Sequence, residues 1–172
     1  MSVRARSWPV LAGIFVLPFA GMTLPLRAQT GPVKAPPAVG TATGSLTVAG
    51  KSMPLTHAIA FNAGARIYVA ITDQALPPDE TKSEFELAKY QFLHKVVGLE
   101  LTLDHTRELT ETAYRWELAR KPCAGCFEVT LAGGPDGPLT GTIKTTAKGE
   151  AEKLKVDVAF SAPFAKPSAA KK

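Results

Sequence analysis

The stretch that decides the fold class is ARIYVAIT, residues 65–72. Its large aliphatic residues, Ile67, Val69 and Ile71, fall at every second position, which is the period of a β-strand. A second stretch, LKVDVAF at residues 154–160, alternates in the same way. This alternation predicts strands that cover a hydrophobic core with one face and meet solvent with the other.

Similar segments recur along the chain, with turn residues at the spacing of about 8–12 residues that is typical of all-β domains. Further strands are predicted at residues 45–49, 54–61, 99–103, 112–118, 127–131 and 139–145. The predicted fold class is mainly β, an antiparallel β sandwich or barrel-like sheet of about eight strands with one helix.

The one substantial helix is predicted from about Glu80 to His94, after the proline pair at 77–78. Asp79 can cap its first turn. The apolar residues of this segment fall at helical spacing, at Phe85, Ala88, Phe92 and Leu93. We expect these residues to form the face of the helix that packs on the sheet.

The first 28 residues have the three parts of a secretory signal peptide. Arg4 and Arg6 give a positive start, residues 10–19 form an uncharged apolar core, and Ala28 is a small residue at the cleavage position. The alternative is an uncleaved membrane anchor, which the three prolines within residues 7–26 disfavour because each removes a helix hydrogen bond. We therefore expect an exported bacterial protein, periplasmic or secreted, without stable membrane insertion after cleavage.

Cleavage would leave 144 residues with 17 basic and 15 acidic side chains, because three arginines lie in the signal peptide. A charge so close to neutral argues against a nucleic-acid binder, which shows a clustered basic face. We divide the rest of the chain into a flexible Pro/Gly-rich spacer at 29–42, a single β domain at 43–162 and a disordered tail at 163–172.

The two cysteines, Cys123 and Cys126, lie in the motif Cys-Ala-Gly-Cys. In an oxidising compartment we expect them to form a disulfide with each other and to close the tip of a hairpin. A redox role would need a helix N-terminus to lower the thiol pKa, whereas predicted strands flank this motif. A zinc site would need the same pair together with histidines from elsewhere in the fold, among His57, His94 and His105. Thiol-dependent redox or metal chemistry therefore stays as the alternative.

Other catalytic patterns are not found in the sequence. It contains no Gly-x-Ser-x-Gly motif, and the glycine-rich turn at 133–137 lacks the Lys-Ser/Thr pair of a phosphate-binding loop. We expect no enzymatic activity, no catalytic or metal-binding residues and no cofactor. Tyr68, Tyr114 and Trp116 form a candidate binding surface, and the alternative is that they belong to the core.

Three short segments of the chain resemble segments of a known group of proteins. The sequence GSLTVAGK at 44–51, the sequence PLTHA at 54–58 and the closing segment VDVAFSAP at 156–163 resemble a group of uncharacterised exported bacterial β domains. The resemblance covers most of the chain after residue 28 and implies the same β fold, with no established activity. The functional expectation is a non-catalytic binding or accessory module of the bacterial envelope, whose partner is an envelope protein or component.

Overall fold

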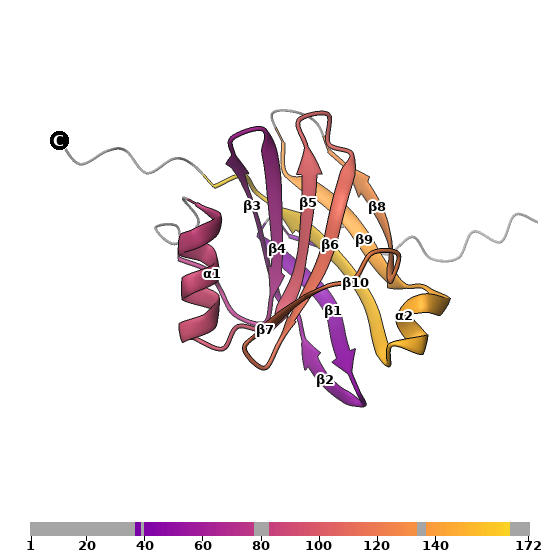
Figure 1. The fold of residues 1–172 in the computed structure, drawn as a ribbon. Helices are drawn as coiled ribbons and strands as arrows, with labels where there is room; N and C mark the ends of the chain where they lie inside the picture. Colours follow the sequence, from indigo (N-terminus) through magenta and orange to yellow (C-terminus); the bar gives the residue numbers. More distant parts are fainter. Residues whose placement is uncertain (1–36, 39, 78–82, 134–136, 166–172) are drawn as a thin grey trace, which may run out of the picture. The chain divides into compact units, whose positions relative to one another are not determined.

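The computed structural model describes residues 37–38, 40–77, 83–133 and 137–165 of the chain. The predicted signal peptide and most of the predicted spacer lie outside these residues. Within them the chain forms ten strands in one antiparallel curled sheet, together with two helices (Figure 1). The predicted fold class, mainly β with a barrel-like antiparallel sheet, is confirmed, although the strands number ten rather than about eight.

The strands are β1 (Thr41–Val48), β2 (Lys51–Pro54), β3 (His57–Ala63), β4 (Arg66–Thr72), β5 (Gly98–Asp104), β6 (Leu109–Trp116), β7 (Ala119–Pro122), β8 (Phe127–Ala132), β9 (Leu139–Thr145) and β10 (Leu154–Ala162). The helices are α1 (Glu84–Leu93) and α2 (Ala147–Ala151). The two short strands β2 and β7 account for the higher strand number, and α2 is a second helix, between β9 and β10, that was not predicted. Neither described helix is long and apolar enough to cross a membrane.

The order of the strands forces the sheet to curl. The hydrogen-bonded path runs β7-β6-β5-β4-β3-β1-β10-β9-β8, with β2 paired to β1. β7 and β8 lie at opposite ends of this path, yet only residues 123–126 connect them. Nine strands at a spacing of about 4.8 Å would separate the ends of a flat sheet by about 38 Å, whereas this connection spans at most about 18 Å. The two ends can meet only if the sheet bends into the half-barrel that is observed.

The curled sheet buries apolar side chains on both of its faces. The main core fills the inner face and includes Leu46, Val69, Ile71, Leu101, Ile143, Val158 and Phe160. A second core lies on the outer face of β3 and β4, where Phe61 and Tyr68 pack against Leu87 of α1. Figure 1 shows α1 beside these two strands. All residues of β4 except Arg66 are buried, because one face meets the main core and the other meets α1.

The helix differs from the predicted one in its start and in its buried face. Ser83 caps α1, and its side chain accepts a hydrogen bond from the Glu86 backbone N–H at 3.2 Å. The expected cap, Asp79, lies outside the described residues. The helix buries Leu87 and Gln91 and exposes Phe85 and most other members of the apolar set that was expected to pack on the sheet.

The predicted domain limits also shift slightly. Strand β1 begins at Thr41, so the last two residues of the predicted spacer belong to the sheet. At the other end, Phe164 forms a bridge with Ala60, and the Ala165 N–H donates to the Ala60 carbonyl at 2.7 Å. The first residues of the predicted disordered tail are therefore part of the fold, because they cover β3.

Gly141 is the glycine on which the inner packing of β9 depends. A Cβ at this position would lie 2.9 Å from the Phe160 ring and would also clash with the Thr130 carbonyl. We expect Gly141→Ala to lower the free energy of unfolding by about 1–3 kcal/mol, since overpacking displaces a core ring. Gly137→Ala is the matched control, because its Cβ meets nothing within 4 Å. Equal stability of the two variants in urea denaturation would contradict this account.

Candidate functional site

The Cys-Ala-Gly-Cys segment is a point at which the chain changes its pairing partner. Before it, β7 pairs with β6, and the Cys123 N–H donates to the Thr112 carbonyl at 2.9 Å. After it, β8 pairs with β9, with Phe127 opposite Thr145. β7 and β8 do not pair with each other in the described chain, so the expected hairpin is wrong. The segment instead carries the chain from one end of the curled sheet to the other.

The two sulfur atoms lie at disulfide distance, with the Cα atoms of Cys123 and Cys126 5.5 Å apart. On the β6 side, the Thr112 hydroxyl donates to the Cys123 carbonyl at 2.8 Å. The side chain of Cys126 is fully buried in the main core, whereas Cys123 is half-buried. The disulfide therefore links Cys123, which is hydrogen-bonded to β6, with Cys126, which lies in the main core.

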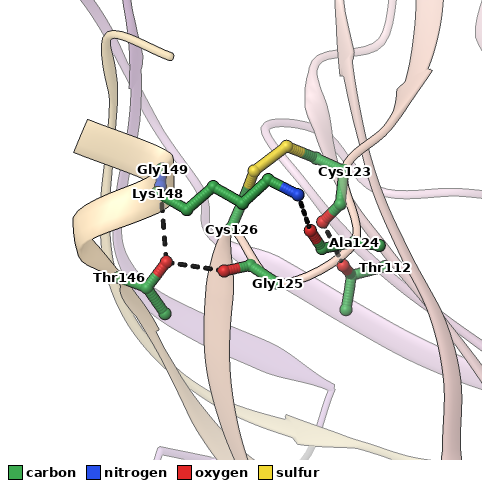
Figure 2. The surroundings of a disulfide bond; sticks show 8 residues. All are labelled: Thr112, Cys123, Ala124, Gly125, Cys126, Thr146, Lys148 and Gly149. Carbon is green, nitrogen blue, oxygen red and sulfur yellow. Dashed lines mark hydrogen bonds between the residues drawn. A yellow bond between two sulfur atoms is a disulfide. The ribbon is translucent and has the colours of Figure 1, made fainter. Parts of the chain in front are cut away.

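The α2 side holds the same segment through its backbone carbonyls, as Figure 2 shows. Lys148 Nζ donates to the Ala124 carbonyl at 2.7 Å, and the Thr146 hydroxyl donates to the Gly125 carbonyl at 2.6 Å. The Thr146 N–H donates to the Cys126 carbonyl at 2.9 Å. Every carbonyl of the segment thus accepts a hydrogen bond, which fixes the loop independently of the disulfide.

This arrangement limits the chemistry that the sulfur atoms can perform. An exchange reaction needs an accessible sulfur and a group that stabilises a thiolate, and such groups are most often supplied by a helix N-terminus. Here Cys126 is inaccessible to solvent, and the polar groups at the start of α2, Thr146 and Lys148, donate to backbone carbonyls of the segment. Among the described residues, no group of three or more His, Cys, Asp or Glu side chains is placed to hold a metal ion.

The disulfide should contribute to stability without being required for folding. Replacing both Cys123 and Cys126 by alanine is expected to lower the free energy of unfolding by about 2 kcal/mol, the chain-entropy value for so short a loop. Lys148→Met is the control, since it keeps the disulfide and removes one hydrogen bond of the loop. Urea denaturation of the oxidised proteins measures both effects. Unchanged stability with lost biological function would favour thiol chemistry instead.

The three candidate aromatic residues are not brought together. Tyr68 lies on the outer face of β4 under α1, where it stacks on Phe61 with ring centroids 5.5 Å apart. Tyr114 and Trp116 lie on the inner face of β6 and pack in the main core. Tyr68 and Tyr114 are both buried. These residues therefore form parts of two cores on opposite faces of the sheet and do not form one surface.

The largest exposed apolar side chains of the described chain gather on α1. Phe85, Phe92 and Leu93 are 77%, 53% and 62% exposed, and we call them the α1 apolar face. Lys89 lies among them, one helical turn from each phenylalanine. It is exposed and forms no ion pair within the described residues. The α1 apolar face thus presents aromatic and aliphatic groups around one free positive charge.

A network of charged side chains lies on the outer face of β5, β6 and β7. Glu100 receives Arg115 Nε at 3.2 Å and Arg120 Nε at 2.6 Å, one on each carboxylate oxygen. Arg120 Nη2 also lies 2.9 Å from Glu111 Oε1. Burial disfavours the charged form of Arg120, but its two carboxylate partners outweigh this and raise its pKa. This network was not predicted from the sequence, although Glu100 is a charged residue between two leucines of β5.

The network continues beneath α1. The Tyr68 hydroxyl donates to Glu84 Oε2 at 2.6 Å, and burial together with this carboxylate raises the Tyr68 pKa. Gln91 lies nearby on the buried side of the helix, only 2% exposed, and its Oε1 atom has no hydrogen-bond partner. A cavity of about 30 Å³ lies between Gln91 and the network of Glu100 and Arg115. The helix therefore packs on the sheet with a polar residue whose hydrogen bonding is incomplete.

Gln91 should reduce the stability of the docked helix. We expect Gln91→Met to raise the free energy of unfolding by about 1 kcal/mol, because it removes a buried acceptor without a partner and keeps the side-chain length. Gln74→Met is the matched control and should lower stability, since Gln74 Nε2 donates to the His94 carbonyl at 3.1 Å. Thermal and urea denaturation test both variants. A destabilised Gln91→Met protein would show that the cavity holds a water bonded to the amide.

A groove of about 410 Å³ lies along the outer face of β8, β9 and β10. Its wall is formed mainly by small side chains such as Thr130, Thr142 and Ala159, with Lys144 opposite Asp157 across the strands. Small side chains offer a ligand little apolar area for each residue in contact. The groove is therefore a weaker candidate for tight binding than the α1 apolar face.

Comparisons of the chain with protein-family models, with curated proteins and with solved structures found no significant match.

Proposed function

We propose that this chain is an exported, non-catalytic accessory module of the bacterial envelope that binds another envelope protein through the α1 apolar face. The observation that carries the proposal is the exposure of Phe85, Phe92 and Leu93 on one helix. Contiguous apolar groups on a protein surface are typical of binding sites. Burying each such side chain in a partner contributes about 1.5–3 kcal/mol, which is enough to support specific binding.

Lys89 defines the chemistry of the partner. A charge surrounded by apolar groups favours a partner segment that places a carboxylate opposite it and apolar side chains around it. A second copy of the same face fits less well, because a symmetric pair of α1 helices would bring the two Lys89 side chains together. The proposed partner is therefore a different protein with an acidic, amphipathic segment.

The packing of α1 supports the same proposal. Gln91 of the helix is buried against the sheet, whereas Phe85 and Phe92 are exposed and do not pack on the sheet. A helix that served only the stability of its own domain would direct its larger apolar residues inward. The surroundings of Cys123 and Cys126 support a structural role for the disulfide, which leaves thiol chemistry as the less favoured reading.

The proposal is tested with variants on the helix surface. The double variant Phe85→Ser and Phe92→Ser should keep its stability within about 0.5 kcal/mol, since both side chains are exposed. A photocrosslinking residue at position 85 of the full chain, expressed in its native cells, should join one envelope protein. The purified partner should bind the double variant at least about tenfold more weakly. Leu118→Ser, at an exposed leucine far from α1 in sequence, should leave the affinity unchanged.

Charge reversal identifies the contact that Lys89 makes. Lys89→Glu should weaken binding, and replacing the facing carboxylate of the partner by lysine should restore it. Equal crosslinking from positions 85 and 118 would contradict the proposal. So would binding of the chain to anionic lipid vesicles that Phe85→Ser and Phe92→Ser abolish, because it would identify a membrane as the occupant.

A further inference from the structure

Only one side of strand β8 has its backbone hydrogen-bonding groups paired with another described strand. In an antiparallel strand, alternate residues direct both of their backbone groups to the same side. The Cys126 carbonyl accepts from Thr146 on the β9 side, and the Thr130 carbonyl lies against Gly141 of β9. The even-numbered residues of β8 therefore face β9.

The odd-numbered residues of β8 face the opposite side. Val129 and Leu131 direct their backbone N–H and carbonyl groups away from β9, and no described strand pairs with them there. Just beyond the end of β8, the Gly133 carbonyl accepts a hydrogen bond from Arg107 Nη1 at 2.9 Å. Arg107 lies in the connection between β5 and β6. The free side of β8 thus faces the side of the sheet where β6 lies.

At the level of Thr112, the residue Cys123 lies between β6 and the start of β8. Cys123 is hydrogen-bonded to Thr112 of β6. The N–H of Cys126, the residue from which β8 continues, donates to the Cys123 carbonyl at 3.3 Å. Strand β7 ends at this level. Beyond it, towards Leu109, no described strand lies between β6 and β8, and we call this gap the β6–β8 seam.

We propose that the β6–β8 seam binds a single extended peptide strand from another protein, which pairs with the free backbone groups of Val129 and Leu131. Strand addition of this kind uses main-chain hydrogen bonds for affinity and alternate side chains for specificity. A second copy of this chain fits less well, because its own β8 carries β9 on one side and contacts at both ends of the seam hinder the approach of a second sheet. This surface is separate from the α1 apolar face and goes beyond the function proposed above.

The side chains around the seam define the peptide. On the inner side, Val129 and Leu131 are half-buried and Leu109 is 39% exposed, so apolar side chains of the peptide would complete their packing. On the outer side, Glu128 of β8 is exposed and forms no ion pair within the described residues, whereas Glu111 of β6 is already paired with Arg120. The preferred peptide therefore alternates apolar residues with basic ones.

Amide hydrogen exchange of the full chain tests the proposal, with the peptide Lys-Val-Lys-Val-Lys-Val-Lys as the probe. In the free protein, we expect the Val129 and Leu131 amides to exchange at least roughly tenfold faster than those of Glu128 and Thr130. The probe should slow the exchange of Val129 and Leu131 roughly tenfold at millimolar concentration. The same peptide with proline at its central position is the control and should have no effect, because it lacks the backbone donor.

Three results would overturn the proposal. The first is slow exchange of Val129 and Leu131 in the free monomer, which would show that the seam is already paired. The second is exchange that the probe leaves unchanged. The third is protection that rises with protein concentration without the probe, which would identify a second copy as the occupant. The double variant Phe85→Ser and Phe92→Ser should respond to the probe like the unmodified chain, so the two proposals can fail separately.

Discussion

The structure depends on the short covalent path between β7 and β8. Four residues cannot bridge the ends of a flat sheet of nine strands, so the path bends the sheet and encloses one of its faces. Side chains from both ends of the strand order then share one core, with Tyr114 of β6 and Phe127 of β8 as examples. The disulfide and the contacts from Thr112, Thr146 and Lys148 hold the point at which this closure occurs. The inner core is therefore a consequence of connectivity as much as of hydrophobic pattern.

The outer face of the sheet differs from the inner face because α1 covers only part of it. Over β3 and β4, α1 supplies Leu87 to a small apolar core. Towards β5 and β6 the same helix meets Glu100 and Arg115, which are buried and paired with each other. A helix that lies over both regions needs an apolar residue at one place and a polar one at the other. This explains why Gln91 faces inward while the phenylalanines of α1 find no partner in their own sheet.

The sequence predicts the parts of this structure that depend on local pattern. The alternation in β4 and β10 and the pairing of Cys123 with Cys126 are of this kind. The buried face of α1 could not be predicted, because Phe85 and Leu87 are both apolar and the side that faces inward depends on the surface below the helix, where Leu87 meets an apolar core. The strand switch at 123–126 was missed for a related reason. The spacing of two strands in sequence favours a hairpin, and only the register of distant strands shows that each pairs elsewhere.

Because the sheet is not fully closed, one strand edge stays unpaired among the described strands, and several features of the fold reduce the aggregation risk of that edge. A barrel closed by hydrogen bonds has no edge strands, whereas this sheet leaves one side of β8 without a partner in the described chain. Unpaired edges promote aggregation, and short strands with charged residues reduce that risk. Strand β8 has six residues and carries Glu128, and the seam beside it is bounded by Cys123 at one end and by the Arg107 contact to Gly133 at the other. Contacts at both ends of the gap hinder the approach of a second sheet more than that of a lone strand. The same geometry that protects the edge from self-association therefore keeps it open to a peptide.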